Sequence, residues 1–165
     1  MFTLGIICGG PSQERGISLN SARIILDHVD KKNIHIQAYF VDQKLRYYAI
    51  PSSQLYSNTP EDFDFKIDQI SNELNESAFI ASLSECNLIF PVIHGSFGED
   101  GKLFKLLEQH NIAFVGNPSD TCKNIYAKDR AYQTLAKHNF PTLAWLAITP
   151  KTSPQSITDF WQKHI

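Results

Sequence analysis

The stretch of residues 88–107 constrains the fold of this chain more than any other. Residues 88–93 are apolar and predict a buried strand, and residues 94–101 form a polar turn that contains three glycines. Apolar side chains then recur at helical spacing to the end of the stretch. A strand, a glycine-rich turn and a helix in this order make half of a βαβ unit, and ligands of open α/β sheets bind beyond the carboxyl ends of such strands. We therefore expect His94 and Gly95, which directly follow the strand, at a ligand site.

A second stretch at the N-terminus has the same form. Residues 2–8 predict a strand, residues 9–15 a turn that begins with two glycines, and a helix follows for which Ser18 is a suitable N-cap. The turn lacks the third glycine of the dinucleotide-binding pattern and the Gly-Lys-Ser/Thr of a Walker loop. If the two strands are near neighbours in the sheet, both turns face one crevice and Glu14 shares a site with His94.

The rest of the chain predicts a mostly parallel α/β sheet with an added hairpin. Imperfect alternation of apolar residues is typical of strands covered on both faces. Residues 51–80 are rich in polar and turn-forming residues, so we expect a surface excursion with small elements of its own. The other expected elements are strands at 35–41, 45–50, 113–115 and 142–148, a helical turn at 78–83, helices at 102–109 and from 119 to about 137, and a last helix from Ser153 that buries Ile157, Phe160 and Trp161.

Composition excludes several classes of protein. The net charge of −2 gives no electrostatic basis for binding nucleic acid or an acidic membrane surface, and no apolar run approaches the ~20 residues that span a bilayer. The N-terminus has no basic stretch typical of a signal peptide, so we expect a cytoplasmic protein. Cys8, Cys86 and Cys122 are far apart and lack metal-ligand spacing, which predicts buried, reduced thiols and no metal site.

Four segments together resemble the N-terminal part of the D-alanine–D-alanine ligase family, whose members are ATP-grasp enzymes of peptidoglycan synthesis. Residues 9–18 are similar to the family's Gly-Gly-x-Ser-x-Glu-Arg-x-Val-Ser, and residues 90–101 contain its His-Gly-x-x-Gly-Glu-Asp-Gly segment. Residues 106–116 resemble the helix and strand that follow in the family, and Lys128 stands where the family has a helix lysine.

The resemblance implies a three-layer, Rossmann-like pre-ATP-grasp domain over residues 1–117, followed by the beginning of an ATP-grasp domain at 118–165. The implied function is that of the N-terminal part of a ligase that joins two D-alanines through an acyl phosphate at the expense of ATP. The segments that complete the ATP-grasp core lie further along the family's chains, so we expect this chain alone to be inactive. Phe104-Lys105 and Ala127 depart from the family pattern, which affects the detail near the nucleotide more than the family assignment.

The resemblance also implies roles for single residues. Glu14 orients the ammonium group of the first D-alanine and balances its charge, His94, Gly95 and Ser18 contribute to the substrate site, and Lys128 contacts ATP phosphates. The residues alone leave other roles open: a solvated turn acid paired with Arg15 for Glu14, a cap of the neighbouring turn for His94, a helix cap for Ser18 and a solvated helix lysine for Lys128.

The implied cofactors are ATP and Mg²⁺ in the complete enzyme, with neither expected on this chain alone. The implied partners are D-alanine, ATP and a second copy of the chain in a homodimer, with no nucleic acid and no membrane. Two other interpretations stay open. One is a stand-alone, non-catalytic small-molecule binding module of the same fold. The other is an unrelated flavodoxin-like or Rossmann-like binder, which the missing glycine fingerprints disfavour.

Overall fold

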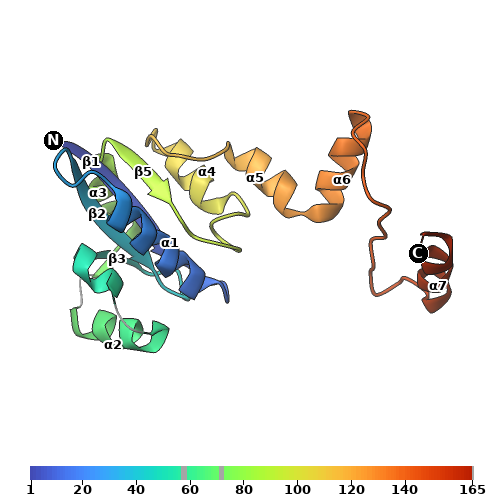
Figure 1. Ribbon diagram of the computed structural model, residues 1–165, viewed down its shortest axis with the longest axis horizontal. Helices are drawn as coiled ribbons and strands as arrows, with labels where there is room; N and C mark the ends of the chain where they lie inside the picture. The colour runs from blue at the N-terminus through green and yellow to red at the C-terminus, as the bar shows by residue number, and fades with distance from the viewer. Residues whose placement is uncertain (57–58, 71–72, 165) are drawn as a thin grey trace. The chain divides into compact units, whose positions relative to one another are not determined.

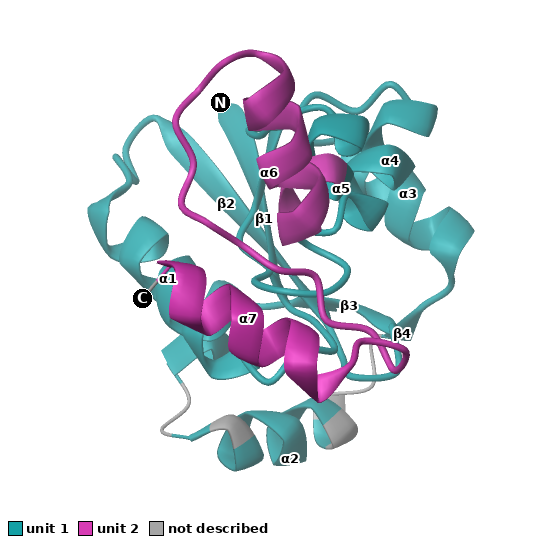
Figure 2. Cartoon of the chain, turned by 90° about the vertical axis from the view of Figure 1, so that its right-hand side faces the viewer, with its two compact units in different colours: residues 1–123 teal, residues 124–165 magenta. Residues whose placement is uncertain are grey.

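The computed structural model describes residues 1–56, 59–70 and 73–164, and of Pro60, Asp68 and Ile70 only the backbone. The chain forms two compact units, residues 1–123 and 124–165, which are coloured separately in Figure 2. Each unit is described by itself. The division after residue 117 that the family resemblance implies stays a prediction.

The first unit is built on a five-stranded sheet with the order β4-β3-β2-β1-β5 (Figure 1). Strand β1 pairs in parallel with both β2 and β5, whereas β3 pairs antiparallel with β2 and β4. All strands except β3 therefore run in the same direction, which confirms the mostly parallel sheet and the hairpin at β2–β3. The strands are β1 (Phe2–Gly9), β2 (Ile34–Val41), β3 (Tyr47–Ile50), β4 (Glu73–Leu74) and β5 (Leu88–Pro91).

Helices cover both faces of this sheet, because alternate residues of its central strands point to opposite sides. Ile6 of β1 belongs to the core that α1, η1 and α2 cover, and Ile7 to the core that α3 and α4 cover. Figure 1 shows α1 and α3 on opposite sides of the sheet. The three-layer architecture is thus confirmed. Its helices are α1 (Arg15–His28), η1 (Ser52–Tyr56), α2 (Pro60–Ile70), α3 (Glu76–Ser84) and α4 (Lys102–Gln109).

Residues 51–80 contain small elements of their own, as expected, but they are not the surface excursion that their polar composition predicts. Leu55 of η1 and Phe63 of α2 are both fully buried and join the core beneath β2 and β3. The Phe63 ring lies 4.6 Å, centroid to centroid, from the ring of Phe40. A few large side chains at helical spacing therefore anchor this otherwise polar segment to the sheet. The hairpin also differs slightly, because Leu45 has a φ of 61° and cannot extend β3, which begins at Tyr47.

Beyond α4 the predicted elements are shorter or absent. Residues 113–115 contribute a single parallel bridge, Ile89 to Phe114, rather than a strand. The helix expected from 119 to about 137 is two helices, α5 (Ser119–Tyr126) and α6 (Lys128–Lys137). Ala127 between them is extended, with φ −79° and ψ 99°, so the helical hydrogen bonds are interrupted there.

In the second unit the expected strand at 142–148 is absent from the described residues, which form irregular chain there. A strand needs a partner for its backbone groups, and residues 124–164 as described contain no strand with which it could pair. Trp145 instead stacks on Tyr132 of α6 with ring centroids 5.7 Å apart. The last helix, α7 (Pro154–His164), begins where expected, but Ile157 and Trp161 are 39% and 61% exposed rather than buried. Among the described residues no helix is long and apolar enough to cross a bilayer.

Candidate ligand site at the ends of β1 and β5

The two glycine-containing turns meet because β1 and β5 are adjacent and parallel, which brings their carboxyl ends to one edge of the sheet. The hydroxyl of Ser12, in the turn after β1, donates to the carbonyl oxygen of His94 at 2.8 Å. The same hydroxyl accepts from the backbone N–H of Glu14 at 3.0 Å. One serine thus ties both turns together, which brings Glu14 and His94 to the same edge of the sheet. That the two residues bind one ligand stays a prediction.

Gly95 lies against the carboxylate of Glu14. Its φ is +72°, and a Cβ atom at this position would lie 2.8 Å from Cβ of Ser12 and 3.2 Å from Oε2 of Glu14. The backbone of the second turn can approach the acid this closely only because residue 95 has no side chain. Glu14 itself is exposed, so its carboxylate is available to a ligand.

Arg15 does not form the ion pair with Glu14 that remained open from the sequence. Its Nη1 atom instead lies 2.6 Å from Oδ1 of Asp64 on α2. The pairing of Glu14 with Arg15 is therefore wrong, whereas a solvated turn acid stays an open role for Glu14. A free carboxylate next to the Gly95 backbone is suited to accept hydrogen bonds from an ammonium group, and such charge-assisted bonds are stronger than neutral ones.

The imidazole of His94 is held from two sides. Its Nε2 lies 3.2 Å from Oγ of Ser21 on α1, and its Nδ1 lies 3.5 Å from Oε1 of Glu99 in its own turn. The ring is 35% exposed, so one edge stays accessible while the two partners restrict its rotation. Sequence reasoning missed Ser12 and Ser21; the available signals were the position of Ser12 inside the glycine turn and of Ser21 one helical turn after Ser18.

Ser18 is neither a helix cap nor exposed to a ligand. Helix α1 begins at Arg15 and its N-cap is Glu14, so Ser18 lies inside the helix and is fully buried. Its hydroxyl accepts the backbone N–H of Gly9 at 2.8 Å. Gly9 and Gly10 have φ angles of +93° and +98°, a conformation that glycine adopts without strain. Ser18 therefore supports the glycine turn, and its role in substrate binding stays a prediction.

Asp100 fixes the other end of the second turn. Its carboxylate accepts the backbone N–H of Lys102 at 3.1 Å and pairs with the ammonium group of that residue at 2.9 Å. Burial alone would raise the pKa of Asp100, but these bonds and one from the Phe97 N–H outweigh it and lower the pKa below its ordinary value. Asp100 is thus ionised at neutral pH, and its bond to the Lys102 N–H lies at the first residue of α4, where a negative charge is favourable.

Lys128 is the first residue of α6 and its side chain is exposed. It belongs to the second unit, so its role stays a prediction. Within the described ranges of both units, no group of three or more His, Cys, Asp or Glu side chains could hold a metal ion. Mg²⁺ is therefore not assigned to these residues.

Comparisons with known proteins match the sequence and the fold of this chain to one family. Residues 3–117 match the family model described as D-ala D-ala ligase N-terminus. D-alanine–D-alanine ligase A of Chromobacterium violaceum is 33% identical over 124 residues, which are 68% of this chain and 34% of that protein. The residues that match the family model include both turns of the candidate site.

Two solved structures show the same fold. The D-alanine–D-alanine ligase of Coxiella burnetii superposes with a TM-score of 0.81 at 23% identity, over 99% of this chain and 50% of that one. The D-alanine–D-alanine ligase of Bacillus anthracis, complexed with ATP, has a TM-score of 0.62 at 18% identity, over 93% of this chain and 42% of that one. The chain thus spans about a third to a half of the length of these relatives.

Proposed function

Because the chain belongs to the D-ala D-ala ligase N-terminus family, we propose that it is the N-terminal part of an ATP-dependent D-alanine–D-alanine ligase and forms the wall that binds the first D-alanine. The observation that supports this proposal most is the exposed carboxylate of Glu14 beside the Gly95 backbone, across the turn from His94. The whole enzyme would join two D-alanines for peptidoglycan synthesis in the cytoplasm.

In this proposal Glu14 accepts hydrogen bonds from the ammonium group of the first D-alanine. The carboxylate lies at the carboxyl end of the β1 segment, and Ser12 holds the Glu14 backbone by its N–H. The acid therefore contributes charge neutralisation and orientation, which are the main sources of catalysis in acyl and phosphoryl transfer. Gly95 keeps the opposite wall within reach of the same ligand.

His94 stands on the other side of this site as a polar group of fixed orientation. Ser21 and Glu99 hold its two ring nitrogens, and the exposed edge of the ring is free to contact the substrate or the tetrahedral intermediate. Ser18 acts through the Gly9 turn, at the rear of the site. We infer that His94 is a binding residue for the reacting groups and Ser18 a positioning residue.

ATP and Mg²⁺ enter the proposal as cofactors of the complete enzyme. The Bacillus anthracis relative binds ATP, and Lys128 is exposed at the start of α6, where a cation can contact phosphate oxygens. ATP supplies the phosphoryl group that activates the carboxylate of the first D-alanine, and the magnesium ligands would come from outside the residues described. A homodimer is the assembly that the family resemblance implies.

The experiment that tests this function is a titration of the ¹⁵N-labelled chain with D-alanine, followed by NMR. We expect saturable shifts of the amides of residues 9–15 and 94–99. Glu14→Gln should weaken binding about tenfold or more, because a hydrogen bond to a charged group contributes about 1.5–3 kcal/mol. Glu61→Gln, which removes an exposed acid from α2, is the matched control and should leave the affinity unchanged.

Two results would count against the proposal. Equal affinity of wild type and Glu14→Gln would remove Glu14 from the site, and L-alanine binding as well as D-alanine would remove the stereochemical basis of the assignment. Ligase turnover is a separate test: we expect no phosphate release from ATP when the 165-residue chain is mixed with D-alanine and Mg²⁺. Release at a rate that depends on D-alanine would show that the remainder of a ligase is not required.

A further inference from the structure

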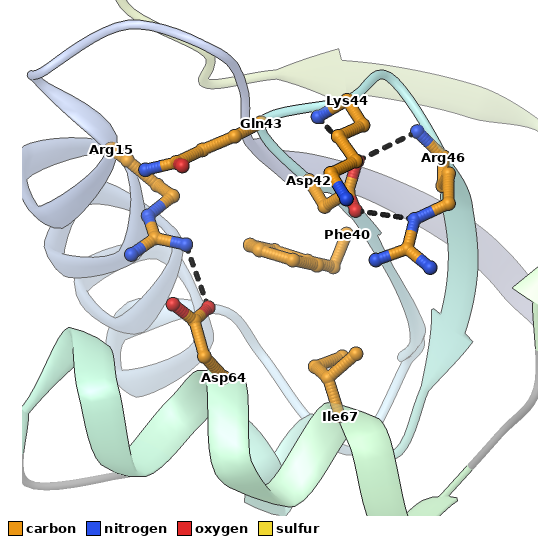
Figure 3. Close-up of a pocket in the computed structure, with 8 residues that line it drawn as sticks. All are labelled: Arg15, Phe40, Asp42, Gln43, Lys44, Arg46, Asp64 and Ile67. Carbon is orange, nitrogen blue, oxygen red and sulfur yellow. Dashed lines mark hydrogen bonds and ion pairs between the residues drawn. The ribbon is translucent and has the colours of Figure 1, made fainter.

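A hollow lies in the first unit, at the carboxyl end of β2, and has no role in the proposed ligase chemistry. It is about 200 Å³ in volume and is enclosed by the start of α1, the turn between β2 and β3, and α2 (Figure 3). Arg15, Lys44 and Arg46 supply positive charge around it, and Phe40 and Ile67 supply apolar surface. We refer to it as the charged hollow.

Asp42 shapes the charged hollow and pairs with Arg46, but among the described residues its carboxylate makes no ion pair with Arg15 or with the ammonium group of Lys44. Its carboxylate accepts the backbone N–H groups of Lys44 and Arg46, each at 2.8 Å, and the Arg46 Nε–H at 2.7 Å. The acid is 12% exposed and its acceptor capacity is spent on the turn that carries it. The turn therefore presents the Lys44 side chain at the rim of the hollow without a partner among the described side chains.

Arg15 has unused donors that face this space. The side chain is 12% exposed, and among the described residues its guanidinium makes one ion pair, from Nη1 to Oδ1 of Asp64. A guanidinium has five N–H donors in a planar fork that matches carboxylate and phosphate groups. Figure 3 shows this guanidinium between Asp64 and the side chain of Gln43, on the wall of the hollow.

We propose that the charged hollow binds a small oxyanion, a carboxylate or phosphate group with a short apolar part. The oxyanion would take the free donors of Arg15, the ammonium group of Lys44 and the amide of Gln43, and its apolar part would lie against Phe40 and Ile67. The three cations exceed the two carboxylates lining the hollow by one charge, which a monoanion would neutralise. The site does not depend on the ligase proposal, and either can fail without the other.

Its position links it to the rest of the fold. Arg15 follows Glu14 directly in the chain, and the Gly10 N–H donates to the Val41 carbonyl at 2.7 Å, just before the turn that carries Lys44. An oxyanion in the charged hollow would thus contact both the turn after β1 and the turn after β2. In open α/β sheets the carboxyl ends of the strands are where ligands bind.

The test is an NMR titration of the chain with sodium phosphate and, separately, with sodium acetate at constant pH and at an ionic strength held constant with sodium chloride. We expect saturable shifts at residues 15 and 42–46 with at least one of the two anions, and the tighter one identifies the oxyanion source. Lys44→Ala should weaken binding at least about fivefold through the loss of a charge-assisted contact. Asp64→Asn should tighten binding, because it removes the competing carboxylate from Arg15.

Lys32→Ala is the matched control, since Lys32 is an exposed lysine that does not line the hollow, and it should leave the affinity unchanged. Shifts that are linear in both anions, or that chloride alone reproduces, would overturn the proposal. So would equal effects of Lys44→Ala and Lys32→Ala, or weaker binding by Asp64→Asn. Both substituted lysines are exposed and Asp64 is 45% exposed, so these variants are expected to fold.

Discussion

The Ser18→Ala substitution tests whether this buried serine supports the glycine turn or binds substrate. In the structure the Gly9 N–H donates to Ser18 Oγ at 2.8 Å, and both residues are buried. Alanine would leave the Gly9 donor unsatisfied, which costs about 1–3 kcal/mol. Because alanine favours a helix interior over serine by about 0.4 kcal/mol, the expected net loss is about 0.6–2.6 kcal/mol.

Ser21→Ala is a matched control on the same helix. It brings the same gain in helix propensity, but it breaks a bond to the half-exposed His94 ring, which water can replace. The difference in stability between the two variants therefore isolates the buried Gly9 donor. At about 4 °C per kcal/mol for a unit of this size, the net loss lowers the melting temperature of Ser18→Ala by roughly 2–10 °C.

The assay combines thermal unfolding, followed by far-UV circular dichroism, with amide hydrogen exchange at Gly9. Tryptophan fluorescence is unsuitable, because Trp145 and Trp161 both belong to the second unit. We expect faster exchange of the Gly9 amide in Ser18→Ala and little change in Ser21→Ala. Equal melting temperatures together with unchanged Gly9 protection would refute the supporting role of Ser18.

Three further predictions concern pH, thiol reactivity and the second glycine turn. Hydrogen bonds from Ser119, at the start of α5, lower the pKa of Glu108. Their stabilisation is therefore complete above the unfolded pKa of about 4.3 and is lost as the pH falls through the lower folded pKa. The melting temperature of wild type should exceed that of Glu108→Gln at pH 6 and converge with it near pH 3, and a constant difference would contradict this. Burial raises the pKa of the Cys8 thiol to about 12. Iodoacetamide at pH 8 should therefore modify half-exposed Cys122 before Cys8, as measured by mass spectrometry of peptides. The reverse order would contradict the burial argument. Gly95→Ala should lower the stability by about 1–2 kcal/mol, because residue 95 has a left-handed backbone conformation, and it should also weaken D-alanine binding. In denaturant titrations the control Gly16→Ala, inside α1, should be neutral or stabilising. Equal effects of the two variants would show that the turn relaxes.

The candidate site could be predicted in outline because its residues are close in sequence to two strong local signals. Each of the two turns follows an apolar strand, and parallel strands end at one edge of the sheet. The sequence therefore predicts Glu14, His94 and Gly95 at one edge of the sheet. It does not predict Ser12 and Ser21 there, because their hydrogen bonds join residues 82 and 73 positions apart and no local pattern indicates such a pair.

Errors occurred where packing decides against local preference. Residues 51–80 have a polar composition, yet Leu55 and Phe63 bury fully because the sheet face beneath β2 and β3 needs cover. Residues 142–148 have the β-branched and aromatic content of a strand, but among the described residues of their unit no strand is present to pair with them. Secondary structure that depends on a distant partner cannot be read from a window of sequence.

The sequence by itself determined the α/β class, the mostly parallel sheet with its hairpin, the two glycine turns and the family, since these follow from short-range periodicity and from motifs of consecutive residues. Only the tertiary structure decided that Arg15 pairs with Asp64 rather than Glu14, that Ser18 supports Gly9, and that the charged hollow exists. The physical reason is that hydrogen bonds and ion pairs depend on distances of a few ångströms between segments far apart in the chain, and those distances arise only when the helices pack on the sheet.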